Sequence, residues 1–474
     1  MTRFPIALLL ALLLPLVASA EAVLRLPNVF GDDMVLQRDA PARVWGSAEP
    51  GAAVRVSVAG VTAEATADGA GAWRVELPAQ PAGGPHELVA ESGDASVRLG
   101  GVLFGEVWLL GGQSNMQMTV AATGEEAPDL PGVRVIRVNP AEADEPQRDA
   151  DLAFGWRPCT PAVAQQTSAV GVAFARRLHA ELGVPVGLIH CNRGGSAIAA
   201  WLRDPPLRER PGLAPFLQKV DHNHGGDKHY ELATHHHAML APFAPMRLGG
   251  VLWYQGEADA RAGVEYRHLL RALLDDWRDA FGDPDLPFGI CQLSSYQHPA
   301  WEMPQPIRYV ELRESQAAVA EADPHAGLIV TYDVGDRFDI HPRRKRPVGE
   351  RAAAWALDTV YGVPTRWRGP SLAGFTQEGN QVRVRMENVE GSLRTRDGGP
   401  VTGFVLLRES GHRDWASGRI EGGDTVVLQS PQPVSDVRYA FYPVPIDANL
   451  TDDSGLPVAP FRTDDRPTPT AGRW

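Results

Sequence analysis

The chain of 474 residues contains only three cysteines, Cys159, Cys191 and Cys291. At most one disulfide can form among them and one thiol must remain, so the fold does not depend on a disulfide scaffold. No pair of these cysteines has the spacing of a metal-binding motif. With 44% hydrophobic and 22% charged residues, the composition is that of a globular protein long enough for two or three domains.

Basic residues are also scarce relative to acidic ones, because 45 Lys and Arg stand against 58 Asp and Glu, a formal net charge of -13. Such a surface repels polyanions, which argues against nucleic acid as a partner.

Long apolar runs are missing beyond the N-terminus. Residues 6–17 form a short apolar stretch between Arg3 and Ala18-Ser19-Ala20, which is typical of a signal peptide cut after Ala20. No later run approaches the roughly 18 residues of a membrane-spanning helix. We therefore expect residues 1–20 to be a leader and the mature protein to be secreted or periplasmic, without a membrane partner.

Three further regions follow this leader. Residues 21–105 contain short alternating runs such as Val54-Arg55-Val56-Ser57-Val58, which predict a small β-sandwich module. Residues 106–362 alternate between strand-like and helical patterns, as in an α/β domain with a parallel sheet. Residues 363–463 return to β-like alternation and predict a second β module. Residues 464–474 are expected to be a poorly ordered tail.

The polar clusters of the middle region follow its apolar runs. Strands are expected at residues 107–110, 186–189, 251–254 and 328–332, and helices at Ala169–Leu182, Tyr266–Phe281, Arg308–Ala322 and residues 348–360. Each conspicuous polar cluster comes just after one of these strands. The carboxyl ends of parallel strands are where open α/β sheets bind ligands.

The first of these clusters contains a serine. Residues 107–118 read V-W-L-L-G-G-Q-S-N-M-Q-M, so a buried strand ends in a Gly-Gly turn that presents Ser114. Ser114 could be a nucleophile if a base reaches it, or it could simply cap the next helix.

The other clusters offer what an ester-cleaving serine needs. Gly194-Gly195-Ser196 can supply a backbone N–H, Gln255 an amide, and His341 a base close to Asp339. Each also has a structural interpretation: Gly194-Gly195 as a turn, Gln255 as a buried core amide and His341 as an ordinary loop residue. Their joint order favours catalysis.

This order resembles the SGNH (GDSL-like) hydrolases, and within them the sialate O-acetylesterase family of carbohydrate acetylesterases. The resemblance rests on four blocks that span most of the middle region: G-G-Q-S-N-M at 111–116, N-R-G-G-S at 192–196 with A-I-A-A-W to Trp201, W-Y-Q-G-E-A-D at 253–259 and D-I-H-P at 339–342. It implies an α/β fold with an SGNH-hydrolase-like three-layer parallel-sheet domain flanked by β-sandwich-like modules.

The resemblance implies that Ser114 is the nucleophile and His341 the general acid and base. It also implies that the oxyanion is held by the N–H groups of Ser114 and Gly195 and by the Gln255 side chain. An Asp usually stands three positions before the histidine, but Phe338 occupies that position here. Asp339, Asp336 or a backbone carbonyl therefore remain the candidates for orienting His341.

The implied activity is removal of O-acetyl groups from a carbohydrate, either sialic acid or an acetylated plant polysaccharide, through an acetyl-serine and without a cofactor or metal. The alternative is a non-catalytic carbohydrate-binding protein with a relic hydrolase domain. The sequence does not indicate the oligomeric state.

Three tempting features favour plain interpretations. The histidines His222, His224, His229, His235, His236 and His237 lack the acidic or cysteine spacing that would complete a metal site. Cys191 is expected to be a buried strand-end thiol rather than a nucleophile. Trp201 could face a sugar, or it could pack in the core.

Overall fold

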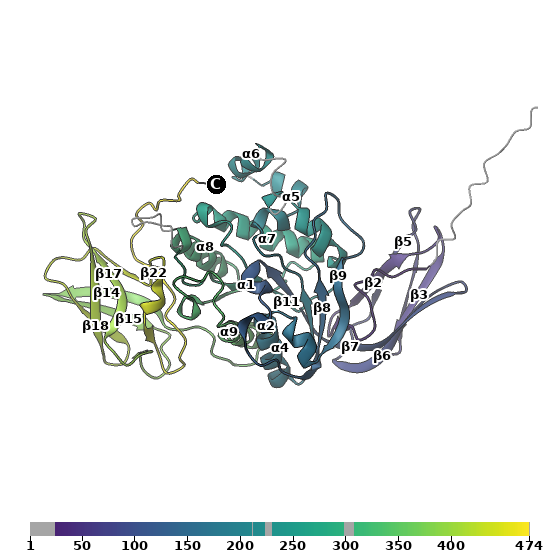
Figure 1. Cartoon of the computed structure of the whole chain (residues 1–474), viewed down its shortest axis with the longest axis horizontal. Helices are drawn as coiled ribbons and strands as arrows, with labels where there is room; N and C mark the ends of the chain where they lie inside the picture. Colours follow the sequence, from purple (N-terminus) through teal and green to yellow (C-terminus); the bar gives the residue numbers. More distant parts are fainter. Residues whose placement is uncertain (1–23, 211, 223–229, 298–307, 474) are drawn as a thin grey trace, which may run out of the picture.

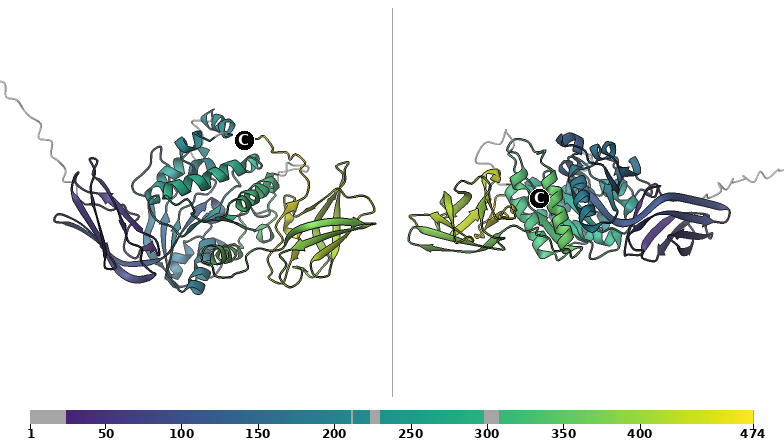
Figure 2. Two further views of the ribbon diagram at one scale, coloured as in Figure 1. Left: turned by 180° about the vertical axis from the view of Figure 1, so that it is seen from behind. Right: turned by 90° about the horizontal axis from the view of Figure 1, so that it is seen from below.

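The computed structural model describes residues 24–210, 212–222, 230–297 and 308–473, so the expected leader at residues 1–20 lies outside the described residues. Three parts lie in a row, with a β module at each end and an α/β body between them (Figures 1 and 2). The mixed α/β class expected from the sequence is confirmed.

The N-terminal β module is joined to the body by one long strand. Its sheet is formed by β1 (Val35–Gln37), β3 (Ala53–Val58), β4 (Val61–Thr66), β6 (Gly83–Ser92) and the first half of β7 (Ala95–Gly112), while β2 (Ala42–Ser47) pairs with β5 (Ala72–Leu77). The expected alternation is visible in β5, where buried Trp73, Val75 and Leu77 alternate with exposed residues. Strand β7 continues without a break past residue 105, so the module and the body share it.

The body is built on a sheet with the strand order β13-β12-β11-β7-β10-β8-β9. Every neighbouring pair is parallel except β8 with β9, which is antiparallel. The strands besides β7 are β8 (Leu130–Val138), β9 (Leu152–Cys159), β10 (Val186–His190), β11 (Gly250–Tyr254), β12 (Phe288–Cys291) and β13 (Ala326–Ile329).

Helices cover both faces of this sheet. Val107 and Leu109 of β7 belong to one hydrophobic core with α7 (Tyr266–Phe281), whereas Trp108 and Leu110 belong to another with α4 (Ala169–Leu182) and α9 (Arg346–Thr359). Successive strand residues point to opposite faces, so this alternation requires helices on both sides. Helix α8 (Arg308–Ala322) packs beside α7.

The long helices begin and end close to where the sequence predicts. The bounds of α4, α7 and α8 match the expected ranges, and α9 is shifted by two residues at its start. Ser168 caps α4, its hydroxyl accepting the Gly171 N–H at 3.2 Å. The short helices are α1 (Ser114–Gln117), α2 (Val120–Thr123), α3 (Pro161–Gln165), α5 (Asp204–Arg208) and α6 (Ala214–His222).

The C-terminal β module has a seven-stranded sheet in the order β14-β15-β19-β18-β17-β20-β22 and a small pair, β16 with β21. The strands are β14 (Ser371–Glu378), β15 (Gln381–Glu387), β16 (Arg394–Thr395), β17 (Val401–Leu407), β18 (Arg413–Glu421), β19 (Thr425–Gln429), β20 (Asp436–Tyr439), β21 (Leu450–Thr451) and β22 (Phe461–Arg462).

The segment after Thr463 differs from the poorly ordered tail that the sequence predicts. Asp464 is buried and accepts two hydrogen bonds of 2.6 Å from Arg438. Further along, the Thr470 hydroxyl accepts the Val264 N–H at 3.0 Å, and the Thr470 N–H donates to the buried carboxylate of Glu311 at 3.1 Å. Composition alone does not reveal such long-range partners.

Two expectations about the whole chain can be compared with the described residues. All three cysteines are buried and none forms a disulfide. Among the helices in the described part of the chain, none is long and apolar enough to cross a membrane.

Candidate active site

Ser114 lies at the carboxyl end of β7, in the middle of the parallel sheet (Figure 1). The turn before it depends on Gly112, whose φ is +123° and where a Cβ would lie 2.3 Å from the carbonyl oxygen of Tyr254. Only glycine allows this approach between β7 and β11. The Gln113 N–H then donates to the same carbonyl at 3.0 Å, and α1 begins at Ser114.

His341 reaches this serine from a distant part of the chain. Its Nε2 lies 2.8 Å from Ser114 Oγ, although the two residues are 227 positions apart. Burial lowers the pKa of His341 below its ordinary value of 6.5; Lys345 also lowers it, and Asp339 opposes this shift. The imidazole is therefore neutral near pH 7 and can accept the serine proton.

Neither candidate carboxylate contacts the His341 ring. Asp339 Oδ1 accepts the backbone N–H of His341 at 2.8 Å, and Asp336 Oδ1 accepts the N–H groups of Phe338 and Asp339 at 2.8 and 3.0 Å. Within the described residues, no carboxylate lies within hydrogen-bonding or ion-pairing distance of the ring. The structure thus brings Ser114 and His341 together as a dyad, with Asp339 bracing the loop.

The Gly-Gly turn after β10 lies against the serine, as expected. A Cβ on Gly194 would be 3.5 Å from the Cβ of Ser114, and its N–H donates to Gln117 Oε1 at 3.0 Å. Gly195 follows with a φ of +76° and is exposed. Its N–H and that of Ser114 have no hydrogen-bond acceptor among the described residues, so both can donate to a bound group.

Gln255 differs from the expected oxyanion donor. It is fully buried, and its Nε2 donates to the carbonyl oxygen of Ser196 at 3.1 Å and to Asp259 Oδ2 at 2.5 Å. Its Oε1 accepts the Tyr266 hydroxyl at 2.7 Å. Both amide hydrogens are therefore used within the protein, and Gln255 positions the strand-end segments around it.

A buried polar network that the sequence did not indicate links three site segments. Asn115, next to the nucleophile, donates to Glu257 and, at 3.0 Å, to the carbonyl oxygen of Ile340; its Oδ1 accepts from Lys345 Nζ at 2.5 Å. Lys345 is only 1% exposed, and burial lowers its pKa to about 8. Burial also raises the pKa of Glu257. The signal was present in G-G-Q-S-N-M and Q-G-E-A-D, but the spacing does not show that these blocks meet.

A cavity of about 640 Å³ opens beside this network. Glu257, Asp259 and Ala197 contribute to its wall, together with Lys219 and Arg261. Burial raises the pKa of Asp259 to about 6. The cavity is large enough for a sugar ring close to the strand-end segments.

The sequence also singled out Trp201, Cys191 and His235, and all three are buried. Trp201 is fully buried against Trp253 and Trp277, and Cys191 is buried with a raised pKa caused by burial. His235 is buried, and its Nδ1 lies 3.0 Å from the Ala141 carbonyl oxygen. His224 and His229 and the side chain of His222 lie outside the described residues; within the described ones, no three His, Cys, Asp or Glu side chains form a metal-binding group.

A serine in contact with a neutral imidazole at the carboxyl edge of a parallel sheet is the arrangement of a serine hydrolase. The comparisons agree with an esterase. Residues 105–339 match the family model described as carbohydrate esterase, sialic acid-specific acetylesterase. The chain is 33% identical over 405 residues, 75% of each chain, to the sialate O-acetylesterases of Homo sapiens and Pongo abelii.

A solved structure is similar over nearly the whole chain. It is a carbohydrate acetylesterase from Xanthomonas citri with 34% sequence identity and a TM-score of 0.84, and the match covers 94% of this chain and 100% of that one. The chain is a carboxylic ester hydrolase and belongs to the sialic acid-specific acetylesterase family of carbohydrate esterases.

Proposed function

We propose that this protein is an exported serine esterase of the SGNH type that removes O-acetyl groups from carbohydrates through an acetyl-Ser114 intermediate. The single observation that carries the proposal is the 2.8 Å contact between Ser114 Oγ and His341 Nε2. Family membership supplies the acetyl ester and the carbohydrate.

In the first step, His341 Nε2 accepts the proton of Ser114 as Oγ attacks the acetyl carbonyl carbon. The resulting imidazolium gives this proton to the sugar oxygen as the ester C–O bond breaks, which leaves acetyl-Ser114. In the second step, His341 removes a proton from water, whose oxygen attacks the acetyl group. Return of the proton to Ser114 Oγ then releases acetate.

The oxyanion of each tetrahedral intermediate is held by the backbone N–H groups of Ser114 and Gly195. Both groups lack acceptors among the described residues, whereas Gln255 donates both of its hydrogens inside the protein. Donors that are already in place need no reorganisation when the negative charge develops, and each contributes about 10²–10³-fold to the rate.

Export rests on the leader pattern of residues 1–20, with the protein secreted or periplasmic after cleavage. The sugar is either sialic acid or an acetylated plant polysaccharide.

The experiment measures acetate release by the purified protein from 4-nitrophenyl acetate, an O-acetyl sialic acid and acetylated xylan fragments, with Ser114→Ala as control. Release from one of the two carbohydrates, abolished in the variant, supports the proposal and selects the sugar. A fluorophosphonate should also label the peptide that contains Ser114. Labelling of another residue, or equal release by the variant, would refute the serine mechanism.

A further inference from the structure

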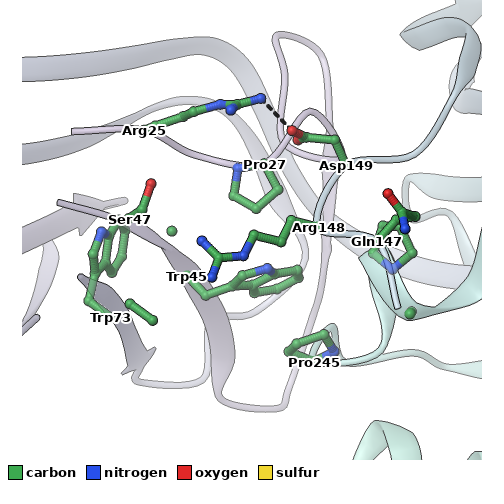
Figure 3. Close-up of a pocket in the computed structure, with 13 residues that line it drawn as sticks. Arg25, Pro27, Trp45, Ser47, Trp73, Gln147, Arg148, Asp149 and Pro245 are labelled. Atoms are coloured by element: carbon green, nitrogen blue, oxygen red, sulfur yellow. Dashed lines mark hydrogen bonds and ion pairs between the residues drawn. The ribbon is translucent and has the colours of Figure 1, made fainter. Parts of the chain in front are cut away.

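A second pocket lies between the N-terminal β module and the body, and none of its wall residues belongs to the Ser114, Gly195 or His341 segments (Figure 3). Its volume is about 300 Å³. Strands β2 and β5 provide Trp45 and Trp73, and the segment before β9 provides Arg148 and Asp149. Small-molecule sites begin at about this volume.

Two indole rings form the apolar part of this pocket. Trp45 is half-buried and held edge-on against Phe30, with ring centroids 4.6 Å apart. Trp73 is 4% exposed, and its buried indole N–H has no hydrogen-bond acceptor among the described residues. The Trp45 N–H has no acceptor there either. The Trp73 N–H is closed off from the pocket, so the group that a bound ligand would meet is the half-buried Trp45 ring with its N–H.

Among the charged side chains that line the pocket, Arg148 has no partner in the part of the chain that the structure describes. Arg25 pairs with Asp149, whose other oxygen accepts the N–H of Asn28 at 2.8 Å, so each oxygen of this carboxylate already has a partner. Arg148 has no hydrogen bond or ion pair with any residue that the structure describes, and its side chain extends toward the Trp45 ring (Figure 3). A guanidinium without a partner among the described residues is suited to a carboxylate, which it can bind through two parallel hydrogen bonds.

We propose that this pocket binds an acidic sugar residue of a glycan, with the sugar carboxylate on Arg148 and a ring face on Trp45. The free groups of the site are donors and an aromatic face, which match a pyranose that carries a carboxylate. Uronic acids and sialic acids share this chemistry. That the carboxylate belongs to a sugar rests on the proposed function.

Such a site binds a sugar residue of a long substrate that lies far along the glycan from the ester to be cleaved. A second contact raises the effective concentration of acetyl groups near Ser114 without changing the chemistry there. It therefore lowers KM for an acetylated glycan that carries a single acidic sugar residue and leaves kcat on a small acetyl ester unchanged.

The test measures binding by calorimetry and tryptophan fluorescence in the full-length Ser114→Ala variant, which separates it from esterase activity. The ligands are glucuronic acid, N-acetylneuraminic acid and neutral glucose. One of the two acids should bind at least tenfold more tightly than glucose and reveal which source fits. Arg148→Gln, an exposed position, should weaken that binding at least tenfold, whereas Arg98→Gln, an exposed arginine of the N-terminal β module that does not line the pocket, should not.

Equal binding of glucose and the acids, no binding of either acid, or equal loss in Arg98→Gln would overturn the proposal. Loss of fluorescence quenching in folded Trp45→Phe would support the stacking contact. If wild type lacks esterase activity but the acid still binds through Arg148, only the proposed function fails.

Discussion

Asp339→Asn should slow the reaction by no more than about tenfold. Asparagine keeps an oxygen that can accept the His341 N–H, so the loop contact of 2.8 Å survives and only the negative charge is removed. Asp339 is exposed, and a pair of unit charges 4 Å apart in water interacts by about 1 kcal/mol, equivalent to about a fivefold change in rate. A triad acid bonded to the imidazole contributes far more, about 10⁴-fold.

The assay is kcat and kcat/KM on one acetyl ester across pH, with Asp336→Asn as matched control and His341→Ala as reference. The Asp339 charge raises the pKa of His341, so its removal lowers that pKa and shifts the acid limb of kcat/KM to lower pH. Asp336→Asn should leave kcat nearly unchanged, and His341→Ala should lose at least about 10³-fold. A loss near 10⁴-fold in folded Asp339→Asn would show that Asp339 bonds the ring during catalysis and would refute the dyad.

Three further predictions follow from the site contacts. Ser114→Ala should keep its fold by circular dichroism and lose at least about 10³-fold in kcat; near-normal turnover would exclude it as the nucleophile. Gln255→Ala should lower the free energy of unfolding in urea by about 1–3 kcal/mol, because the buried carbonyl oxygen of Ser196 loses the amide that donates to it; unchanged stability together with a large loss of kcat would restore Gln255 as an oxyanion donor. Lys345→Met removes a cation that lowers the pKa of His341, so the acid limb should move to higher pH, opposite to Asp339→Asn; a shift to lower pH would contradict the assigned electrostatics.

The helices could be predicted from the sequence because the signal for a helix, the spacing of its apolar residues, lies within the helix itself. In α4 and in α7 the apolar residues recur with the helical period, so the ends of both helices could be placed from the sequence. The strand expected at 328–332 is shorter, since β13 ends at Ile329 and Tyr332 enters a 3-10 turn. The Tyr332 hydroxyl donates to the carbonyl oxygen of Val458 at 3.0 Å, a partner 126 residues away that no local pattern shows.

The residues of the candidate site also divide into those that local patterns predict and those whose distant partners hide them. The Gly-Gly turns and Ser114 are local features, and their positions at strand ends followed from apolar runs. The hydrogen-bond partners of Gln255 could not be predicted, because a buried amide and an oxyanion donor look the same in the sequence. Lys345 was missed because a single lysine after a loop is ordinarily solvated, whereas here it is buried on Asn115.

The loop that carries His341, the proposed base, is held by contacts from the C-terminal module as well as from the body. Before His341, Asp333 is clamped by Arg351 of α9 through two contacts of 2.7 Å, and its carbonyl oxygen accepts a hydrogen bond of 3.3 Å from Arg396 of the C-terminal module. Arg337 pairs with Asp447 of the same module at 3.1 Å. Because no carboxylate among the described residues bonds the His341 ring, its position depends on the backbone of this loop, which these contacts hold in place. The C-terminal module therefore helps to hold the loop that places His341 against Ser114.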